Sequence, residues 1–321
     1  MKKIIFLIAA LVVALISLSS ANAQTYPTKP ITIVVGFGPG GNADIVARIV
    51  SQKMAENLGQ SILIENKGGA GGLLASDSVA KAPADGYRLS LISGAFPAQA
   101  AALHKLPFDP AKDFSWVGTI ISYPLVVVVP SDSPFKTLED LVKTAKSNPR
   151  KLNYPSPGNG SLFHLATEVF TSSAGIEMTH VPFRGGSQQL TELLGGRLDV
   201  MFDTLSVVQP QLKAGRLRAL AVTSMRRMPQ LPSVPTVAEK FQGYEASSFL
   251  GLAGPAGLSE SIVQRLSSAI KIVTSSGDVQ QRFTDLGGEA WTGTPGEMAA
   301  YIASSTTKWK SVVQEKNIAA D

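Results

Sequence analysis

Two glycine-rich segments carry the residues with the clearest capacity for chemistry. The first is Gly36-Phe-Gly-Pro-Gly-Gly-Asn42, and the second is Pro155-Ser-Pro-Gly-Asn-Gly-Ser161. Each follows a predicted strand and precedes an amphipathic pattern that predicts a helix. Glycine lets the backbone approach a ligand closely, and a helix start offers unpaired N–H groups with about half a positive charge. Each segment is therefore predicted to bind an anion, and the pair predicts two lobes that grip one small anionic molecule.

The first segment also fits a different class of site. Gly36, Gly38 and Gly41 match the G-x-G-x-x-G spacing of dinucleotide sites, and Glu65 ends the next predicted strand, near the place of a ribose-binding acid. An exported oxidoreductase is therefore the rival interpretation. The stiff Pro39-Gly40 turn, the preceding export signal and the second segment of a different type all weigh against it. A Walker A loop is excluded because no Gly-Lys-Ser/Thr follows.

Polar side chains stand where the two predicted helices begin. Asn42 is predicted to cap the first helix, and Asp44 falls in its first turn. Asp44 fits two roles equally well, interaction with the helix dipole and ordering of a ligand. Ser161 suits a helix cap as well as an anion contact. His164 is a candidate contact one turn further on, although a single helical histidine more commonly packs or lies at the surface. The second segment draws its hydroxyl and amide donors from Ser156, Asn159 and Ser161.

Two charged residues follow later predicted strands. Arg184 follows His180-Val-Pro-Phe and fits either a forked bond to a carboxylate or a surface ion pair. Asp203 ends another strand and is expected to line the site. No G-x-S-x-G elbow occurs, and no pair of carboxylates has the spacing for acid–base catalysis, so no enzymatic activity is predicted. Neither a cofactor nor a metal is expected, because the three histidines lack acidic partners at zinc spacing.

The N-terminal residues predict export. Lys2 and Lys3 precede the apolar run 4–18, and Ala21-Asn-Ala23 is a cleavage motif, so cleavage is expected after Ala23. The apolar run is shorter than the roughly 20 residues of a membrane span, which makes an N-terminal anchor the weaker alternative. The expected compartment is the periplasm.

Composition excludes several further classes. Loss of Lys2 and Lys3 with the leader lowers the formal charge from +5 to +3, and the basic residues are scattered, so no nucleic-acid partner is expected. The chain contains no cysteine, which excludes disulfides and thiolate catalysis. Stability must come from a hydrophobic core, for which the chain is long enough.

Short β-branched runs alternate with helical patterns, which predicts an α/β fold with mostly parallel sheets. The run Leu125–Val129 is interpreted as a crossing between two lobes, and Ala246–Ala253 as the return crossing. The predicted organisation is a signal peptide over 1–23, a first lobe over 24–124 plus 247–321, and a second lobe over 125–246. The predicted strands are Ile31–Val35, Ser61–Glu65, Tyr87–Ile92, Leu125–Val129, Lys151–Tyr154, Met178–Val181, Asp199–Phe202, Arg218–Val222 and Phe249–Ala253. The predicted helices are one that includes Ile45 and Ile49, and then Thr137–Ser147, Ser161–Ser173, Ser187–Leu194, Ser259–Ser275 and Pro295–Gln314.

Motifs along nearly the whole mature chain resemble one family. They include Glu65-Asn-Lys-Gly-Gly-Ala-Gly-Gly72, Ala84-Asp-Gly-Tyr87, Leu106-Pro-Phe-Asp109, Asp199-Val-Met-Phe-Asp203 and Leu231-Pro-Ser-Val-Pro-Thr236. Taken in this order, they resemble the Bug family of periplasmic solute-binding proteins, the receptors of tripartite tricarboxylate transporters. No single motif would be specific.

The resemblance implies a type II-like periplasmic binding protein, with two hinged α/β lobes and a deep cleft. It implies that both glycine loops hold a small organic carboxylate, partly through waters, and that membrane transporter subunits are the partners of a monomeric receptor. A sensor lobe that reports to a membrane kinase is an alternative. By resemblance, the ligand contacts are Phe37, Gly38, Gly40, Gly41, Asn42, Ser156, Gly158, Asn159, Gly160 and Ser161, with Asp44 and Asp203 at positions common in the family. The chain departs from the family pattern at Asn42-Ala43, where glycine or threonine is usual, and at Gly38, where proline is commoner.

Overall fold

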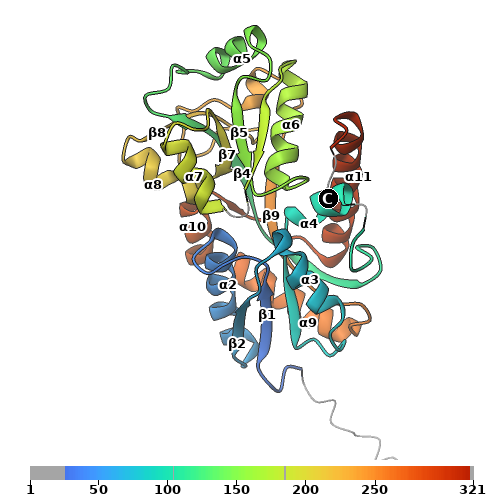
Figure 1. Ribbon diagram of the computed structural model, residues 1–321. Helices are drawn as coiled ribbons and strands as arrows, with labels where there is room; N and C mark the ends of the chain where they lie inside the picture. The colour runs from blue at the N-terminus through green and yellow to red at the C-terminus, as the bar shows by residue number, and fades with distance from the viewer. Residues whose placement is uncertain (1–25, 104, 184–185, 319–321) are drawn as a thin grey trace, which may run out of the picture.

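The longest strand connects the two halves of the molecule. The computed structural model describes residues 26–103, 105–183 and 186–318. Strand β4 (Phe114–Pro130) passes from the lower half of Figure 1 into the upper half. The side chains of 125–129 are fully buried. A continuous apolar run of this kind is typical of a strand that is covered on both faces.

Three parallel strands form one end of the larger sheet. β1 (Ile31–Val35) lies between β2 (Ile62–Asn66) and β3 (Arg88–Ser93). Because the three strands are parallel, the loops that leave their carboxyl ends meet at one edge of the sheet. The helical segments that follow these strands are α2 (Asn42–Leu58), η1 (Ala70–Gly72), α3 (Leu73–Ala80) and α4 (Ala95–Ala102).

The remaining strands of this sheet pair antiparallel to their neighbours. β9 (Ser247–Pro255) lies between β3 and the first half of β4, and β10 (Glu289–Ala290) pairs with β4 on its other side. The second half of β4 pairs with β7 (Met201–Thr204) and β8 (Leu217–Val222). The eight-stranded sheet is therefore mixed, because the two long crossing strands run against the strands beside them.

A second, two-stranded sheet carries the other glycine loop. β5 (Asn153–Ser156) pairs parallel with β6 (Thr179–Pro182). Helix α6 (Leu162–Ala174) is the next element after β5, so the second loop repeats the strand–loop–helix order of the first. The helical segments of this half are α5 (Leu138–Ser147), α6 (Leu162–Ala174), α7 (Gly186–Leu194), α8 (Leu205–Lys213) and η2 (Val237–Glu239).

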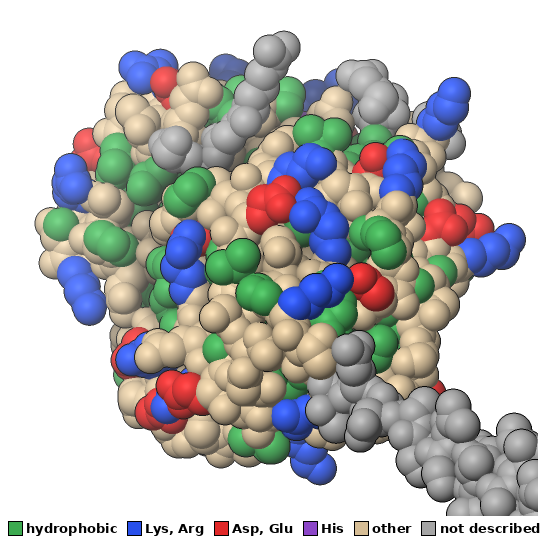
Figure 2. Space-filling model, turned by 90° about the horizontal axis from the view of Figure 1, so that it is seen from below, with side chains coloured by type: hydrophobic (Ala, Val, Ile, Leu, Met, Phe, Trp, Pro, Cys, Tyr) green, Lys and Arg blue, Asp and Glu red, His purple; other side chains and the backbone are tan. Residues whose placement is uncertain are grey.

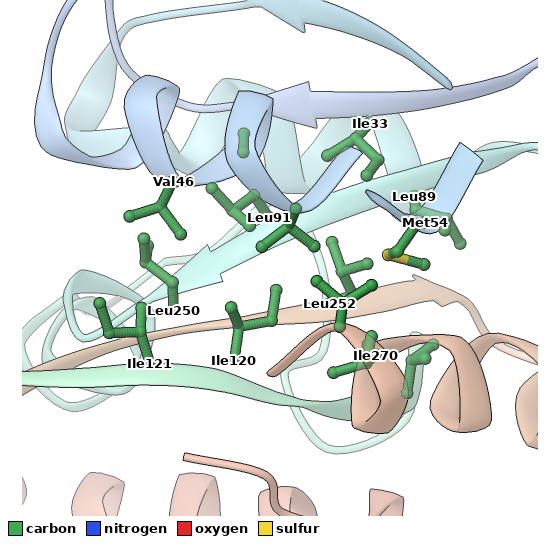
Figure 3. Packing of buried hydrophobic residues seen from close by; sticks show 14 of the residues in the cluster. Ile33, Val46, Met54, Leu89, Leu91, Ile120, Ile121, Leu250, Leu252 and Ile270 are labelled. Carbon is green, nitrogen blue, oxygen red and sulfur yellow. The ribbon is translucent and has the colours of Figure 1, made fainter. Parts of the chain in front are cut away.

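Buried side chains form separate hydrophobic clusters in the two halves. One cluster draws on residues 31–123 and 250–283, and Figure 3 shows Ile33, Val46 and Leu252 among its members. Another draws only on residues between Leu125 and Ala246. The lobe boundaries predicted from the sequence remain a prediction. Two lobes would each be expected to have a hydrophobic core, and these two clusters are separate.

The C-terminal helix packs against both halves. α11 (Pro295–Glu315) follows α9 (Glu260–Thr274) and α10 (Gly277–Asp285). Its first turns place Met298 in a cluster with aromatic side chains from β4 and β9, whereas Trp309 near its end packs against α6. In Figure 1 this red helix lies beside both α4 and α6.

The α/β fold with flanking helices is confirmed, and several helix starts follow from capping chemistry. Thr137, Ser161 and Ser259 cap α5, α6 and α9 through their side-chain oxygens. A cap of this kind contributes about 1 kcal/mol to helix stability. Among the described residues no helix is long and apolar enough to cross a membrane. The predicted signal peptide lies outside the described residues.

Charged side chains are interspersed on the face that Figure 2 shows. Lysine and arginine alternate there with aspartate and glutamate, and apolar side chains lie between them. This face therefore presents no stripe of a single sign, in agreement with the scattered basic residues of the sequence.

Candidate functional site

One side of the first glycine loop packs against the segment that follows β2, and the other side is exposed. A Cβ atom at Gly36 would lie 2.5 Å from the Cα of Gly72, so only glycine fits where this loop meets the segment that follows β2. By contrast, Cβ atoms at Gly38 and Gly40 would meet no atom within 4 Å, and both residues are exposed. Gly40 also has a φ of 78°, a backbone conformation that glycine adopts much more readily than other residues. Backbone thus faces open space at the carboxyl end of β1.

Asp44 holds this loop in shape. Its carboxylate accepts hydrogen bonds from the Gly40 N–H at 2.9 Å, from Arg48 Nε at 3.0 Å and from Asn66 Nδ2 at 3.0 Å. Asn66 Nδ2 also donates to the carbonyl oxygen of Phe37 at 3.0 Å. The hydrogen bond from Arg48 is the main cause that lowers the pKa of Asp44 to about 2. These bonds give Asp44 a structural role, and direct contact between Asp44 and a ligand remains a prediction.

Helix α2 begins one residue earlier than the sequence predicted. Gly41, not Asn42, is the N-cap, and no side chain caps the first turn. The prediction of Asn42 as the cap was wrong, because Gly41 adopts the extended cap conformation and Asn42 already belongs to the helix. The first bond of the helix runs from the Ile45 N–H to the Gly41 carbonyl. The N–H groups of residues 42–44 therefore have no acceptor within the helix, an arrangement that can bind an anion.

The second glycine loop is held by side chains beneath it. The Ser156 hydroxyl is fully buried and donates to the Gly158 carbonyl at 2.9 Å, and it lies 2.6 Å from His180 Nε2. The Gly160 N–H donates to His164 Nδ1 at 3.1 Å. Ser161 caps α6 by accepting a hydrogen bond from the His164 N–H at 3.3 Å. Gly158 needs a positive φ of 132°, and a Cβ atom there would meet nothing within 4 Å.

Two stacked histidines support this loop. The rings of His164 and His180 have centroids 3.8 Å apart and are inclined by only 10°. Burial lowers the pKa of His164 to about 4, and burial together with its neighbour lowers the pKa of His180 to about 3. Both rings are therefore neutral at pH 7. The two imidazoles therefore contribute no positive charge to the second loop at pH 7.

Polar side chains meet at Tyr123 of β4, which lies beside Ser248 of β9 and Asn42 at the start of α2. Burial raises the pKa of Tyr123, and the charge of Asp203 adds to this effect, while Ser248 and Asn42 act against it. Asn42 lies beside Tyr123, yet neither polar atom of its side-chain amide makes a hydrogen bond of good geometry.

Asp203 itself is buried, with 8% of its surface exposed. Its Oδ1 accepts a hydrogen bond from the Thr204 N–H at 2.7 Å and lies 3.4 Å from the Thr204 hydroxyl. Burial raises the pKa of Asp203 to about 7, and the Thr204 bonds oppose this shift.

Other predicted site residues have varied surroundings. Phe37 is half-buried against the core, Asn159 is exposed at the tip of the second loop, and Arg184 lies outside the described residues. Glu65, the acid of the dinucleotide interpretation, accepts a hydrogen bond from Arg88 at 2.9 Å. In the described part of the chain, no group of three or more histidine, aspartate or glutamate side chains could hold a metal.

Sequence reasoning missed several supporting residues. No role was predicted for Asn66, Tyr123, His180 and Ser248, although Asn66 stands in a motif of the resembled family. The sequence gives little indication of these roles, because each residue contacts a partner that is distant in sequence. Asn66 bonds to Asp44, and His180 lies beside Ser156.

Comparisons with known proteins agree with this architecture. The family model described as "Tripartite tricarboxylate transporter family receptor" matches residues 46–318. A "UPF0065 protein in tcbD-tcbE intergenic region" of Pseudomonas sp. strain P51 is 38% identical over 308 residues, which cover 94% of this chain and 92% of the relative.

Two solved structures of similar proteins contain small carboxylates. One is described as "R. palustris Rpa4515 with adipate". It is 34% identical with a TM-score of 0.86, and the match covers 92% of this chain and 99% of that one. The other is "MatC (Rpa3494) from Rhodopseudomonas palustris with bound malate". It is 32% identical with a TM-score of 0.81, and the match covers 90% of this chain and 100% of that one.

Proposed function

Because the chain belongs to the tripartite tricarboxylate transporter receptor family, we propose that it captures a small organic carboxylate and delivers it to a membrane transporter of that type. The family consists of periplasmic solute-binding receptors rather than enzymes. The observation that carries the proposal is the pair of braced glycine loops. Each exposes backbone at the start of a helix and is fixed from behind by buried side chains.

Capture is proposed to take place between two lobes. The lobes are residues 24–124 plus 247–321 and residues 125–246, after removal of a signal peptide that ends at Ala23. The separate hydrophobic clusters in the two halves support this division. The proposed contacts from the two loops are Phe37, Gly38, Gly40, Gly41, Asn42, Ser156, Gly158, Asn159, Gly160 and Ser161. Arg184, His164, Asp44 and Asp203 complete the proposed site.

The electrostatics of the loops favour a carboxylate. Oriented N–H groups at two helix starts supply positive potential without any charged side chain in the loops. Hydrogen bonds to a charged acceptor contribute about 1.5–3 kcal/mol each. The proposed ligand class is di- and tricarboxylates or aromatic acids. The adipate and malate in the similar structures make dicarboxylates the first candidates.

A binding screen tests this proposal. The purified mature protein is titrated calorimetrically with adipate, malate, citrate, benzoate and nicotinate, with NAD as the probe for the rival oxidoreductase. We expect saturable binding of at least one carboxylate and none of NAD. Binding of NAD alone, or of none of these acids between pH 5 and 8.5, would contradict the receptor proposal.

A further inference from the structure

Polar side chains line up beneath the second glycine loop, between the two-stranded sheet and α6. Tyr154 and Ser156 lie on one face of β5, because side chains alternate along a strand, and His180 of β6 is opposite Tyr154 in the register. His164 and Glu168 stand four residues apart on α6 and therefore share one face of the helix. We call Tyr154, Ser156, His164, Glu168 and His180 the polar column.

Contacts run through the polar column from Glu168 to the loop. The Tyr154 hydroxyl donates to Glu168 Oε1 at 2.5 Å, and the Tyr154 ring lies with its centroid 5.2 Å from that of His180. His180 Nε2 lies 2.6 Å from the Ser156 hydroxyl, which donates to the Gly158 carbonyl at 2.9 Å. Tyr154 is fully buried, so its ring cannot shift without moving these neighbours. The position of Glu168 therefore affects the shape of the loop at Gly158.

A cation from another helix holds Glu168 in place. Lys316 Nζ lies 3.7 Å from Glu168 Oε2, and the two side chains are 24% and 15% exposed. Lys316 also donates to the Thr171 hydroxyl at 3.3 Å, and that hydroxyl lies 3.3 Å from Glu168 Oε2. In the part of the chain that the structure describes, no other lysine or arginine pairs with Glu168. Removing one partner from a largely buried ion pair leaves the other charge uncompensated, which is strongly unfavourable.

Lys316 acts from the far end of α6. Thr171, which it contacts, lies about 15 Å along the helix axis from Ser161 in the loop, at 1.5 Å per residue. Lys316 is the C-cap of α11, and the same helix end is fixed by a bond from the Ser172 hydroxyl to Glu315 at 3.1 Å. The first turns of α11 pack in the other half of the molecule through Met298. α11 thus connects the packing of the first half to the polar column of the second.

We propose that Glu168 and Lys316 are positioning residues for ligand binding, because their ion pair fixes Tyr154 and His180 and, through them, the second glycine loop. This inference rests on the proposed carboxylate-binding function, and it places a determinant of affinity outside the proposed contacts. Coupling between two sites is reciprocal, so a ligand at the loop must in turn change the Lys316–Glu168 pair.

Substitution of Lys316 tests the proposal by calorimetry. The ligand is adipate or malate, whichever binds wild type more tightly. Lys316→Met removes the cation and keeps an unbranched apolar side chain, so we expect the dissociation constant to rise by about 2- to 30-fold. Lys316→Arg keeps the cation and should restore binding. Lys310→Met is the matched control, because Lys310 is exposed on the same helix, and it should bind like wild type.

A double-mutant cycle shows whether Lys316 acts through Glu168. Glu168→Gln keeps an acceptor for the Tyr154 hydroxyl and removes the charge that Lys316 balances. In this background Lys316→Met should weaken binding much less than it does in wild type, because no uncompensated carboxylate remains. Equal effects of Lys316→Met in the two backgrounds would overturn the proposed route through Glu168.

Nuclear magnetic resonance of wild type provides a measurement that needs no destabilising variant. In protein with isotope-labelled lysine, the side-chain signal of Lys316 is the one that Lys316→Arg lacks. We expect ligand addition to shift this signal and to leave that of Lys310 unchanged. A Lys316 signal that does not respond to saturating ligand would contradict the reciprocal coupling and overturn the proposal.

The outcomes separate this inference from the function on which it rests. Wild-type affinity in Lys316→Met, with or without a lower melting temperature, would reduce the ion pair to a structural role and leave the receptor intact. Absence of binding to wild type would overturn the receptor proposal, and this inference with it.

Discussion

Gly38 offers a direct test of the first loop at the scale of one residue. The loop owes its shape to Asp44, which accepts from the Gly40 N–H and pairs with Arg48. Gly38 takes no part in that bracing. A Cβ atom there meets no neighbour within 4 Å, and its φ lies outside the left-handed region. A larger side chain at Gly38 therefore occupies only the space in front of the loop.

We expect Gly38→Val to abolish ligand binding while the protein stays folded. Loss of one hydrogen bond to a carboxylate weakens binding by roughly 10- to 150-fold, and steric exclusion adds to this. The free energy of unfolding should change by no more than about 1 kcal/mol. Calorimetry and urea unfolding measure the two effects, with Gly296→Val, at an equally open and exposed position on α11, as the control. Wild-type affinity in Gly38→Val would show that the first loop is not the carboxylate site.

At the scale of elements, the histidine stack couples α6 to β6 beneath the second loop. The Gly160 N–H needs an unprotonated His164 Nδ1 as its acceptor. His180 Nε2 meets the Ser156 hydroxyl, which already donates to the Gly158 carbonyl, so His180 must be the donor. The geometry of the loop therefore depends on neutral imidazoles, whose ordinary pKa is about 6.5.

This dependence predicts acid sensitivity with a definite sign. Burial lowers the pKa of both histidines in the folded protein, to about 4 for His164 and about 3 for His180, so the unfolded chain binds more protons below pH 6.5. Their stabilisation is complete above pH 6.5 and is lost as the pH falls toward 4. His164 alone accounts for up to about 3 kcal/mol.

Urea unfolding from pH 4 to 7 measures this loss. The matched variant is His164→Asn with His180→Gln, because the two amides keep an acceptor near Nδ1 and a donor near Nε2. Its free energy of unfolding should fall less steeply with acidification than that of wild type. Parallel pH profiles would refute the role of the stack.

At the scale of the whole molecule, three connections join the two halves. β4 and β9 cross between them as paired strands, and α11 packs on both through Met298 and Trp309. A ligand that contacts both loops binds the closed arrangement more tightly and shifts the population toward it. The hinge is then expected at the crossing strands, with α11 sliding over one of its neighbours.

Closure should be visible by small-angle X-ray scattering. Saturating ligand should reduce the radius of gyration of wild type and raise its melting temperature, by the equivalent of about 2.7 kcal/mol at a hundredfold excess over Kd. Gly38→Val at the same ligand concentration should show neither change. Superimposable scattering curves with and without bound ligand would rule out a two-lobed trap, even if calorimetry had confirmed binding.

Local chemistry was predictable from the sequence, and distant packing was not. β1 and the capped starts of α5, α6 and α9 were predicted correctly because their signals lie within a few residues. The first half of β4 was missed because Gly118 and Pro124 interrupt its apolar pattern, and α3, α4, α8 and α10 were missed because tertiary packing selects them. The two glycine loops were identified as candidate sites. Their bracing depends on pairs such as Asn66 with Asp44 and His180 with Ser156, which no sequence spacing reveals.

The strand order has a consequence for how this chain folds. β9 lies between β3 and β4, although about 120 residues separate it from β4 along the chain. Residues 26–130 therefore cannot complete their own sheet, because the central strand β9 is made only after the whole segment 131–246. Loop closure of this length is slow, and the nascent chain keeps unpaired strand edges until Pro255 has been synthesised. A polypeptide whose sheet forms late stays unfolded for longer during synthesis. An unfolded chain can cross a membrane, in agreement with the proposed export.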